Sequence, residues 1–217
     1  MSRVLLESAP VTVGNIFCIG RNYAAHAAEL GNAVEPEPLV FLKPTSAIAL
    51  ENQPVTLPAF SHEVHHEGEL VVLIGKGGTD ISEAEALAHV AGYGVGLDLT
   101  ARDVQADAKA RGLPWTKAKG FRGAACVSAF VSAMQVRSPQ ALHFSLSVNG
   151  QVRQQGDTSL MLFPVARIIS TLSSVYGLSE GDLIFTGTPE GVAALAPGDT
   201  VEMVLEQWVT ARWQVAA

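Results

Sequence analysis

Two glutamates, Glu67 and Glu69, open an apolar run that ends at Ile74. A short apolar run of this kind is typical of a buried β-strand, which predicts a strand over residues 67–74. Since successive side chains of a strand point to opposite faces, both carboxylates are expected on one face. Two like charges there repel each other unless a cation lies between them. The stretch therefore predicts either a cation site or an edge strand whose two glutamates lie in water.

Carboxylate oxygens favour one class of metal ion. Hard cations such as Mg²⁺ and Mn²⁺ prefer oxygen ligands, whereas zinc prefers histidine and cysteine. Three histidines that would suit zinc, His62, His65 and His66, precede the strand. We interpret His65 and His66 as groups that support the site or the fold rather than as ligands. The expected cofactor is therefore Mg²⁺ or Mn²⁺.

Length and charge exclude several classes of protein. A chain of 217 residues is expected to form one domain, residues 1–217, with a sizeable core. A net charge of −7 argues against a surface for nucleic acid or for an anionic membrane. Neither a membrane-spanning apolar run nor a signal peptide is recognisable in the sequence. Cys18 and Cys126 are too few for a disulfide framework, so a reducing, cytoplasmic location is expected.

Hydrophobic periodicity predicts a β-rich fold. Apolar and polar residues alternate over residues 142–148 and lead to Asn149-Gly150, the strongest hairpin signal in the chain. Many short strands and few helices favour the α+β class, mainly β, arranged as a roll. Further strands are expected at residues 11–19, 39–42, 91–98, 183–185, 200–205 and 208–215, and helices at residues 82–89, 100–110 and 163–175.

An alanine-rich segment, residues 21–32, is expected to form a short helix with Asn22 as its N-cap. His26 and Glu29 are three residues apart, so they would be neighbours on one face of that helix. A single histidine on a short helix is more commonly a packed structural residue than a catalytic one. Similarly, a lysine at the end of an apolar strand, as Lys43 is, usually lies at the surface. Whether His26 and Lys43 have functional roles therefore depends on the motifs around them.

Several short motifs follow one another in a characteristic order. They are Ile19-Gly20-Arg21-Asn22-Tyr23, Phe41-Leu42-Lys43-Pro44, His65-His66-Glu67-Gly68-Glu69, Leu97-Asp98-Leu99-Thr100-Ala101-Arg102-Asp103, Gly112-Leu113-Pro114-Trp115-Thr116-Lys117-Ala118-Lys119, Val148-Asn149-Gly150 and Thr186-Gly187-Thr188-Pro189-Glu190-Gly191. With these motifs the chain resembles the fumarylacetoacetate hydrolase family, and in particular its small acylpyruvase-like branch, over residues 17–198. Each motif alone is weakly specific, but their common order is a strong signal.

The resemblance implies a mixed β-sandwich roll of the fumarylacetoacetate hydrolase C-terminal-domain type, commonly a homodimer. It implies that Mg²⁺ or Mn²⁺ is held by Glu67, Glu69 and Asp98. Residues 20–32 are expected to act as a mobile lid. The implied catalytic residues are His26 and Glu29, as a water-activating pair, and Lys119; the implied substrate contacts are Arg21, Lys43, Arg102, Gln105 and Thr188.

The implied activity is metal-dependent hydrolysis of a C–C bond in acylpyruvates (2,4-dioxo acids), which gives pyruvate and a carboxylic acid. Charge would develop on a metal-stabilised pyruvate enolate, and decarboxylation of oxaloacetate, a second expected activity, would give the same enolate. Two alternatives remain open: an isomerase or decarboxylase of aromatic-catabolic 2-oxo acids, and a non-catalytic metal-binding protein. Lys43, Lys119 and the His26–Glu29 pair argue against the latter, because a structural metal site needs none of them.

Overall fold

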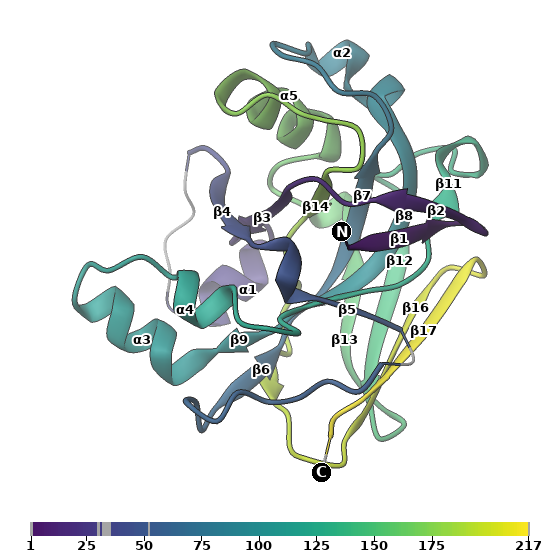
Figure 1. Cartoon of the computed structure of the whole chain (residues 1–217). Coiled ribbons are helices and arrows are strands. Elements are labelled where there is room, and N and C mark those ends of the chain that lie inside the picture. The colour runs from purple at the N-terminus through teal and green to yellow at the C-terminus, as the bar shows by residue number, and fades with distance from the viewer. Residues whose placement is uncertain (1, 30, 32–35, 52, 217) are drawn as a thin grey trace.

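The largest β-sheet carries the strand that contains Glu69, and a smaller sheet packs against it (Figure 1). The computed structural model describes residues 2–29, 31, 36–51 and 53–216. Within these ranges the chain forms four sheets and five α-helices. The predicted class, α+β and mainly β with a mixed sandwich roll, is confirmed, and the large sheet is curled.

The large sheet mixes parallel and antiparallel pairs. β14 runs parallel to β3 and β10 runs parallel to β5, whereas β7 and β8 at its centre are antiparallel. Every residue of β7 is buried, which explains its apolar run without polar alternation. In spatial order the strands are β4 (Leu39–Lys43), β3 (Ile16–Gly20), β14 (Leu183–Phe185), β7 (Gly68–Ile74), β8 (Val90–Asp98), β10 (Ala125–Val127) and β5 (Ile48–Leu50), with β11 (Val131–Ser132) beside β8.

An antiparallel sheet of four strands packs on β7 and β8. A Cβ added at Gly68 would lie 2.9 Å from Leu146 Cδ1 and 3.0 Å from Met203 Cε, so the two sheets approach closely there. One hydrophobic cluster runs through both sheets. The strands of the second sheet are β13 (Gln151–Asp157), β12 (His143–Val148), β16 (Thr200–Leu205) and β17 (Val209–Gln214); smaller sheets consist of β15 (Ala193–Ala194), β6 (Val64–His66) and β9 (Thr100–Ala101), and of β1 (Arg3–Leu6) and β2 (Ala9–Thr12).

The helices lie outside the sheets, and two pairs of them pack together. α2 and α5 lie at one end of the molecule, and α3 and α4 lie beside β9 (Figure 1). Helices form in the three predicted regions, but with other bounds: α2 is followed by the 3₁₀ turn η2, α3 begins only at Arg102 because Thr100–Ala101 pair as strand β9, and α5 begins at Val165. Helix α4 was not predicted. Among the described helices, none combines the length and the hydropathy needed to cross a membrane. The helices are α1 (Ala24–Glu29), α2 (Glu83–Ala86), α3 (Arg102–Ala110), α4 (Thr116–Lys119), α5 (Val165–Val175) and the 3₁₀ turns η1 (Thr45–Ala47), η2 (Leu87–His89), η3 (Ala133–Gln135) and η4 (Thr158–Leu160).

The predicted hairpin forms at Asn149-Gly150, and both residues have positive φ, as a type I′ turn requires (52° and 78°). Beyond the turn the register shifts: Ser147 pairs with Val152, but Leu146 pairs with Gln154. Arg153 is therefore the extra residue of a β-bulge. In a regular hairpin Arg153 would lie opposite Leu146. Because of the bulge Gln154 takes that place, and it is 1% exposed.

Two predicted strands have different limits in the structure. Glu67 lies between β6 and β7, because β6 pairs with β9 and β15 while β7 pairs with β8 and β14. The chain thus changes sheets at Glu67. The strand expected over residues 11–19 is interrupted before β3, where the backbone N–H of Asn15 donates to Asp182 Oδ1 at 2.6 Å. In both places a contact distant in sequence interrupts a locally regular pattern.

Among the described residues of the short helix predicted at residues 21–32, Ala24–Glu29 are helical. Residues 30 and 32 lie outside the described part of the chain. Asn22 forms tertiary hydrogen bonds instead of capping this helix: its Nδ2 donates to Phe163 O at 3.0 Å and to Thr186 O at 2.7 Å, and its Oδ1 accepts from Phe163 N–H at 2.7 Å. Movement of residues 20–32 as a lid stays a prediction.

Replacing Asn22 should destabilise the protein strongly. Asn22 is fully buried, so Asn22→Ala removes three hydrogen bonds and leaves buried backbone groups without partners. We expect the free energy of unfolding to fall by about 2–4 kcal/mol. Urea unfolding measures this change, with Gln155→Ala, an exposed position on β13, as the control. Equal unfolding midpoints for the two variants would contradict the prediction.

Candidate active site

Three carboxylates meet near one end of the two central strands. Glu69 belongs to β7, Asp98 is the last residue of β8, and Glu67 lies just before β7. The backbone holds them in register, since Asp98 N–H donates to the carbonyl oxygen of Glu67 at 2.9 Å. One oxygen of each carboxylate lies within 4.8 Å of the others, and all three side chains are buried. So much negative charge in the interior requires cations nearby.

Two lysines neutralise part of this charge. Lys119 from α4 donates to Glu67 Oε2 at 2.8 Å and to Asp98 Oδ2 at 2.7 Å. Burial alone would lower the pKa of Lys119, but Asp98 and Glu67 raise it above its ordinary value. Lys43, at the end of β4, lies 2.7 Å from Asp98 Oδ1 and also donates to the backbone carbonyl of Leu99. Both ammonium groups are therefore held as fixed positive charges beside Asp98.

Glu67 has a further cationic partner. Arg102, at the start of α3, pairs with Glu67 Oε1 at 2.5 Å, and its other terminal nitrogen donates to Gln105 Oε1 at 2.8 Å. Burial raises the pKa of Glu67, but Lys119 and Arg102 outweigh burial and hold that pKa below its ordinary value. Glu67 is therefore ionised throughout the neutral range.

The contacts of Glu69 differ from those of the other two carboxylates. Its Oε2 accepts a hydrogen bond from Gly187 N–H at 2.7 Å, and no lysine or arginine of the described residues pairs with it. Burial, followed by the charges of Asp98 and Glu67, raises the pKa of Glu69 well above its ordinary value. Asp98 Oδ1, although close to Lys43, accepts no hydrogen bond within the described structure. A hard divalent cation would satisfy both groups, so this donor set fits Mg²⁺ or Mn²⁺.

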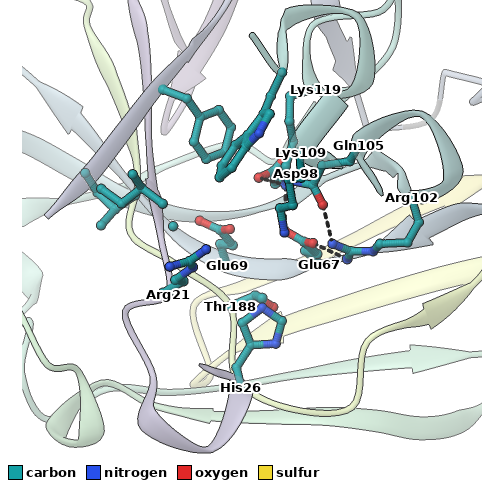
Figure 2. Close-up of a pocket in the computed structure, with 15 residues that line it drawn as sticks. Arg21, His26, Glu67, Glu69, Asp98, Arg102, Gln105, Lys109, Lys119 and Thr188 are labelled. Atoms are coloured by element: carbon teal, nitrogen blue, oxygen red, sulfur yellow. Dashed lines mark hydrogen bonds and ion pairs between the residues drawn. The ribbon is translucent and has the colours of Figure 1, made fainter. Parts of the chain in front are cut away.

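The carboxylates line a cavity of about 40 Å³ (Figure 2). Phe41 and Trp115 form an aromatic wall, with ring centroids 6.0 Å apart in an edge-on arrangement. Lys119 Nζ lies 5.0 Å from the Phe41 centroid, and Lys109 Nζ lies 5.2 Å from the Trp115 centroid. The lining residues are Ile19, Gly20, Arg21, His26, Leu39, Phe41, Glu67, Glu69, Asp98, Arg102, Gln105, Lys109, Trp115, Lys119 and Thr188.

Four cationic side chains, Arg21, Arg102, Lys109 and Lys119, line this cavity. Arg21 follows β3 with a left-handed backbone (φ 60°), which turns the chain toward α1. Burial lowers the pKa of Lys109, and the charges of Arg102 and Arg21 lower it further. Such mutual repulsion between cations is relieved when an anion binds among them. The cavity therefore suits a negatively charged ligand, although the whole chain is acidic.

His26 reaches the cavity from α1 with a carboxylate behind it. Its Nδ1 lies 3.3 Å from Glu29 Oε2, and the same carboxylate accepts hydrogen bonds from Gly191 N–H at 3.1 and 3.3 Å. A carboxylate beside Nδ1 favours the tautomer with the proton on that nitrogen. Nε2 of His26 is then the basic nitrogen, and the side chain lines the cavity (Figure 2).

Most predicted site residues line the cavity, but Glu29 and Lys43 do not. Glu29 contacts the site through His26. The ammonium group of Lys43 is buried beside Asp98 and two backbone carbonyls, and its role as a substrate contact stays a prediction. The sequence reasoning missed Phe41, Trp115 and Lys109 as lining residues. Helical spacing could have found Lys109, since it lies seven residues after Arg102 on the same face of α3.

Comparison with known proteins agrees with this geometry. The model of the fumarylacetoacetate (FAA) hydrolase C-terminal domain matches residues 15–216. Oxaloacetate tautomerase FAHD1 of Mus musculus is 49% identical over 201 residues, 93% of this chain and 91% of the mouse protein. The mitochondrial oxaloacetate decarboxylase of Dictyostelium discoideum is 44% identical over 188 residues, 86% of each chain.

Solved structures agree as well. Fumarylpyruvate hydrolase from Pseudomonas aeruginosa, in complex with Mn²⁺ and pyruvate, superposes with a TM-score of 0.95 at 37% identity. That comparison covers 99% of this chain and 95% of the Pseudomonas chain. With a family model that matches nearly the whole chain and relatives that share almost half of its residues, the chain belongs to the fumarylacetoacetate hydrolase family.

Proposed function

We propose that this chain is a divalent-metal-dependent enzyme that interconverts the keto and enol forms of oxaloacetate. The observation that carries the proposal is the distribution of charge around one cavity. Three buried carboxylates share the cavity with Arg21, Arg102, Lys109 and Lys119, and one of the three, Glu69, forms no ion pair with any residue that the structure describes. A small cavity that combines a metal-binding cluster with several cationic side chains suits a short dianionic 2-oxo acid. The activity named for the mouse relative supports this choice.

Glu67, Glu69 and Asp98 would hold the ion. A bound Mg²⁺ or Mn²⁺ supplies a Lewis acid that stabilises negative charge on the keto oxygen of the substrate. Mn²⁺ in the Pseudomonas hydrolase supports a divalent ion here, and we propose Mg²⁺ or Mn²⁺. Lys119 adds to this stabilisation. Its ammonium has three N–H donors, of which Glu67 and Asp98 occupy two, so one remains for the substrate.

Cationic side chains orient the substrate. Arg102 is fixed by Glu67 and Gln105, which leaves part of its guanidinium for a carboxylate in the cavity. Lys109 and Arg21 line the same space and offer charge to the second carboxylate of a dicarboxylic acid. A substrate held at both ends presents the carbon between its carbonyl and its distal carboxylate in one orientation.

His26 moves the proton. In the keto form, Nε2 of His26 takes a proton from C3, and the electron pair of that C–H bond forms the C2–C3 double bond. The carbonyl electrons move to the C2 oxygen, which a proton from solvent converts to the enol. Glu29 stabilises the imidazolium while it exists, through the contact at Nδ1. After this step His26 releases its proton to solvent. In the reverse direction the enol oxygen loses its proton to solvent, and the His26 imidazolium returns a proton to C3 as the carbonyl re-forms.

Metal binding should depend on Glu69 more than on any exposed carboxylate. We expect Glu69→Gln to weaken Mn²⁺ binding by about 10²-fold or more, since it removes the ligand that lacks a protein cation. The raised pKa of Glu69 also predicts a pH dependence: the affinity for Mn²⁺ should fall as the pH drops through that pKa, because a proton then occupies the carboxylate. Calorimetric Mn²⁺ titration at several pH values measures both effects. Glu63→Gln, a half-exposed carboxylate nearby, is the control; equal losses in both variants would refute the assignment.

Loss of the proposed base should slow tautomerisation. His26→Ala should lower kcat by about 10²-fold or more while KM changes little, because the cationic groups that bind the substrate remain. The rate is followed by the ultraviolet absorbance of enol-oxaloacetate with and without Mg²⁺. His143→Ala, an exposed histidine on β12, should keep the parent rate. A parent protein with no metal-dependent rate above the spontaneous reaction would rule out the proposed function.

A second candidate function is hydrolysis of acylpyruvates. The contact between His26 and Glu29 favours it, since such a pair can activate water, and the name of the Pseudomonas structure supports it. Water, deprotonated by His26, would add to the C4 carbonyl carbon. The C3–C4 bond would then break, with its electron pair leaving on pyruvate and the acyl part leaving as a carboxylic acid. Charge again develops on the C2 oxygen, so the same site would serve both reactions.

Acylpyruvate hydrolysis and oxaloacetate decarboxylation, the two activities expected from the sequence, respond differently to the same variant. Hydrolysis needs water activation, whereas decarboxylation of oxaloacetate releases CO₂ without a base. His26→Ala should therefore lower acylpyruvate hydrolysis by about 10²-fold relative to oxaloacetate decarboxylation, and Glu69→Gln should lower both. Pyruvate release from both substrates gives the ratio of rates. An unchanged ratio in His26→Ala would show that His26 does not act as the base.

Assembly and location are part of the proposal as well. A homodimer is supported by the family resemblance and by two exposed apolar side chains, Leu42 and Leu113, which line an outer pocket with Phe41 and Trp115. A cytoplasmic location stays a prediction from the sequence, whereas the mouse and Dictyostelium relatives are mitochondrial by name.

A further inference from the structure

Gln154 forms hydrogen bonds with two parts of the candidate active site, and it lies in none of the sequence motifs described above. It lies on β13, in the second sheet, and is 1% exposed. Its Oε1 accepts a hydrogen bond from Gly68 N–H at 2.9 Å, between the two glutamates of the carboxylate cluster. Its Nε2 donates to Thr188 Oγ1 at 2.8 Å and to Pro189 O at 2.9 Å, in the loop that lines the cavity.

The orientation of this amide is determined by its backbone partners. Gly68 N–H can only donate and Pro189 O can only accept, so Oε1 must face Gly68 and Nε2 must face Pro189. His66 Nδ1 lies 3.1 Å from the same Oε1 and must therefore carry a proton. Burial lowers the pKa of His66, which favours its neutral form. The amide thus has a definite donor side and a definite acceptor side.

The same bonds determine what the Thr188 hydroxyl can offer. Thr188 Oγ1 accepts from Gln154 and donates its single proton to Gly68 O at 2.9 Å. Toward the cavity it retains only a lone pair. A ligand group that meets this oxygen must therefore be a hydrogen-bond donor, such as a water molecule or an enol hydroxyl, rather than a carboxylate.

The loop that Gln154 holds also carries the partner of Glu69. Gly187, the residue before Thr188, donates its N–H to Glu69 Oε2 at 2.7 Å. Gly191, further along the loop, packs against the bulge that positions Gln154: a Cβ there would lie 2.2 Å from Arg153 O. Gln154 therefore contacts the strand of the metal-binding cluster and the loop opposite it at once.

We propose that Gln154 is a positioning residue, whose amide fastens the Glu67–Glu69 segment to the Gly187–Thr188 loop and leaves the Thr188 hydroxyl only able to accept from a ligand. It touches neither the ion nor the substrate, and it acts through Gly68 and Thr188. An effect of Gln154 on metal affinity rests on the proposed function. The link between the two segments does not depend on that function.

The Gln154 contact has two halves: Oε1 accepts from Gly68 N–H and His66, and Nε2 donates to Thr188 and Pro189. Two substitutions separate these halves. Gln154→Met keeps the length of the side chain and removes both halves. Gln154→Glu keeps the acceptors for Gly68 N–H and His66 but cannot donate to Thr188 or Pro189. Gln155→Met, on the exposed neighbour in β13, is the matched control.

Amide hydrogen exchange in metal-free protein reports on each half. In Gln154→Met, peptides that cover residues 66–70 and 186–191 should exchange about tenfold faster or more than in the parent. In Gln154→Glu only the peptide over residues 186–191 should exchange faster. Gln155→Met should match the parent. Parent-like exchange of residues 186–191 in Gln154→Glu would overturn the proposal, and this variant decides the question if Gln154→Met does not fold.

Mn²⁺ affinity, measured by calorimetry where every variant is folded, reports on the consequence. Gln154→Met should bind Mn²⁺ about 10- to 100-fold more weakly than the parent and Gln155→Met. Equal affinities in the three proteins would overturn the positioning role toward the ion. A parent protein that binds no Mn²⁺ would instead contradict the proposed function, and the exchange comparison would still decide whether Gln154 fastens the two segments.

Discussion

The ion contact that Lys119 makes with Glu67 and Asp98 is the constraint on which the rest of the structure depends. Neighbouring strands bring these carboxylates together, but no strand can supply the cation. It comes from α4, a four-residue helix after the Trp115 turn, and Lys43 comes from β4, the edge strand against which α4 packs. Removal of one partner from such a buried group would leave an uncompensated charge, which costs several kcal/mol. The fold therefore has to join segments far apart in sequence before the site can exist.

Within this cluster two chemically identical side chains have opposite properties. Lys119 and Arg102 lower the pKa of Glu67, which remains ionised, whereas burial and like charges raise the pKa of Glu69. Within the described part of the chain, lysine and arginine side chains pair with Glu67 and Asp98, whereas Glu69 accepts a hydrogen bond from the backbone N–H of Gly187. This asymmetry distinguishes a site prepared for an added cation from a salt-bridge network that is already complete.

The sequence predicted what depends on local pattern. The hairpin at Asn149-Gly150, helix α5 and the buried strand β7 follow from turn chemistry and periodicity alone. It did not predict that the chain changes sheets at Glu67 or that Asn22 bonds to Phe163 instead of capping a helix, because distant partners decide both. The carboxylates and the cationic residues Arg21, Lys43, Arg102 and Lys119 were recognisable as members of ordered motifs, and their spacing in the chain gives no distance between them. His26 was assigned through the family resemblance, and Lys109 was missed.

Gln154 shows why the remainder of the site is invisible in the sequence. Regular alternation from the hairpin turn would place Arg153 toward the interior, and only the bulge replaces it with Gln154. The Gln154 amide can reach the backbone of Gly68 because Gly68 has no side chain. A Cβ at that position would crowd Leu146, Met203 and Gln154 Oε1. A glycine between two glutamates, a shift of one residue in another sheet and a loop more than 30 residues further on must therefore agree in space. None of these three features signals its role in its own stretch of sequence, because the packing of one sheet on the other brings them into contact.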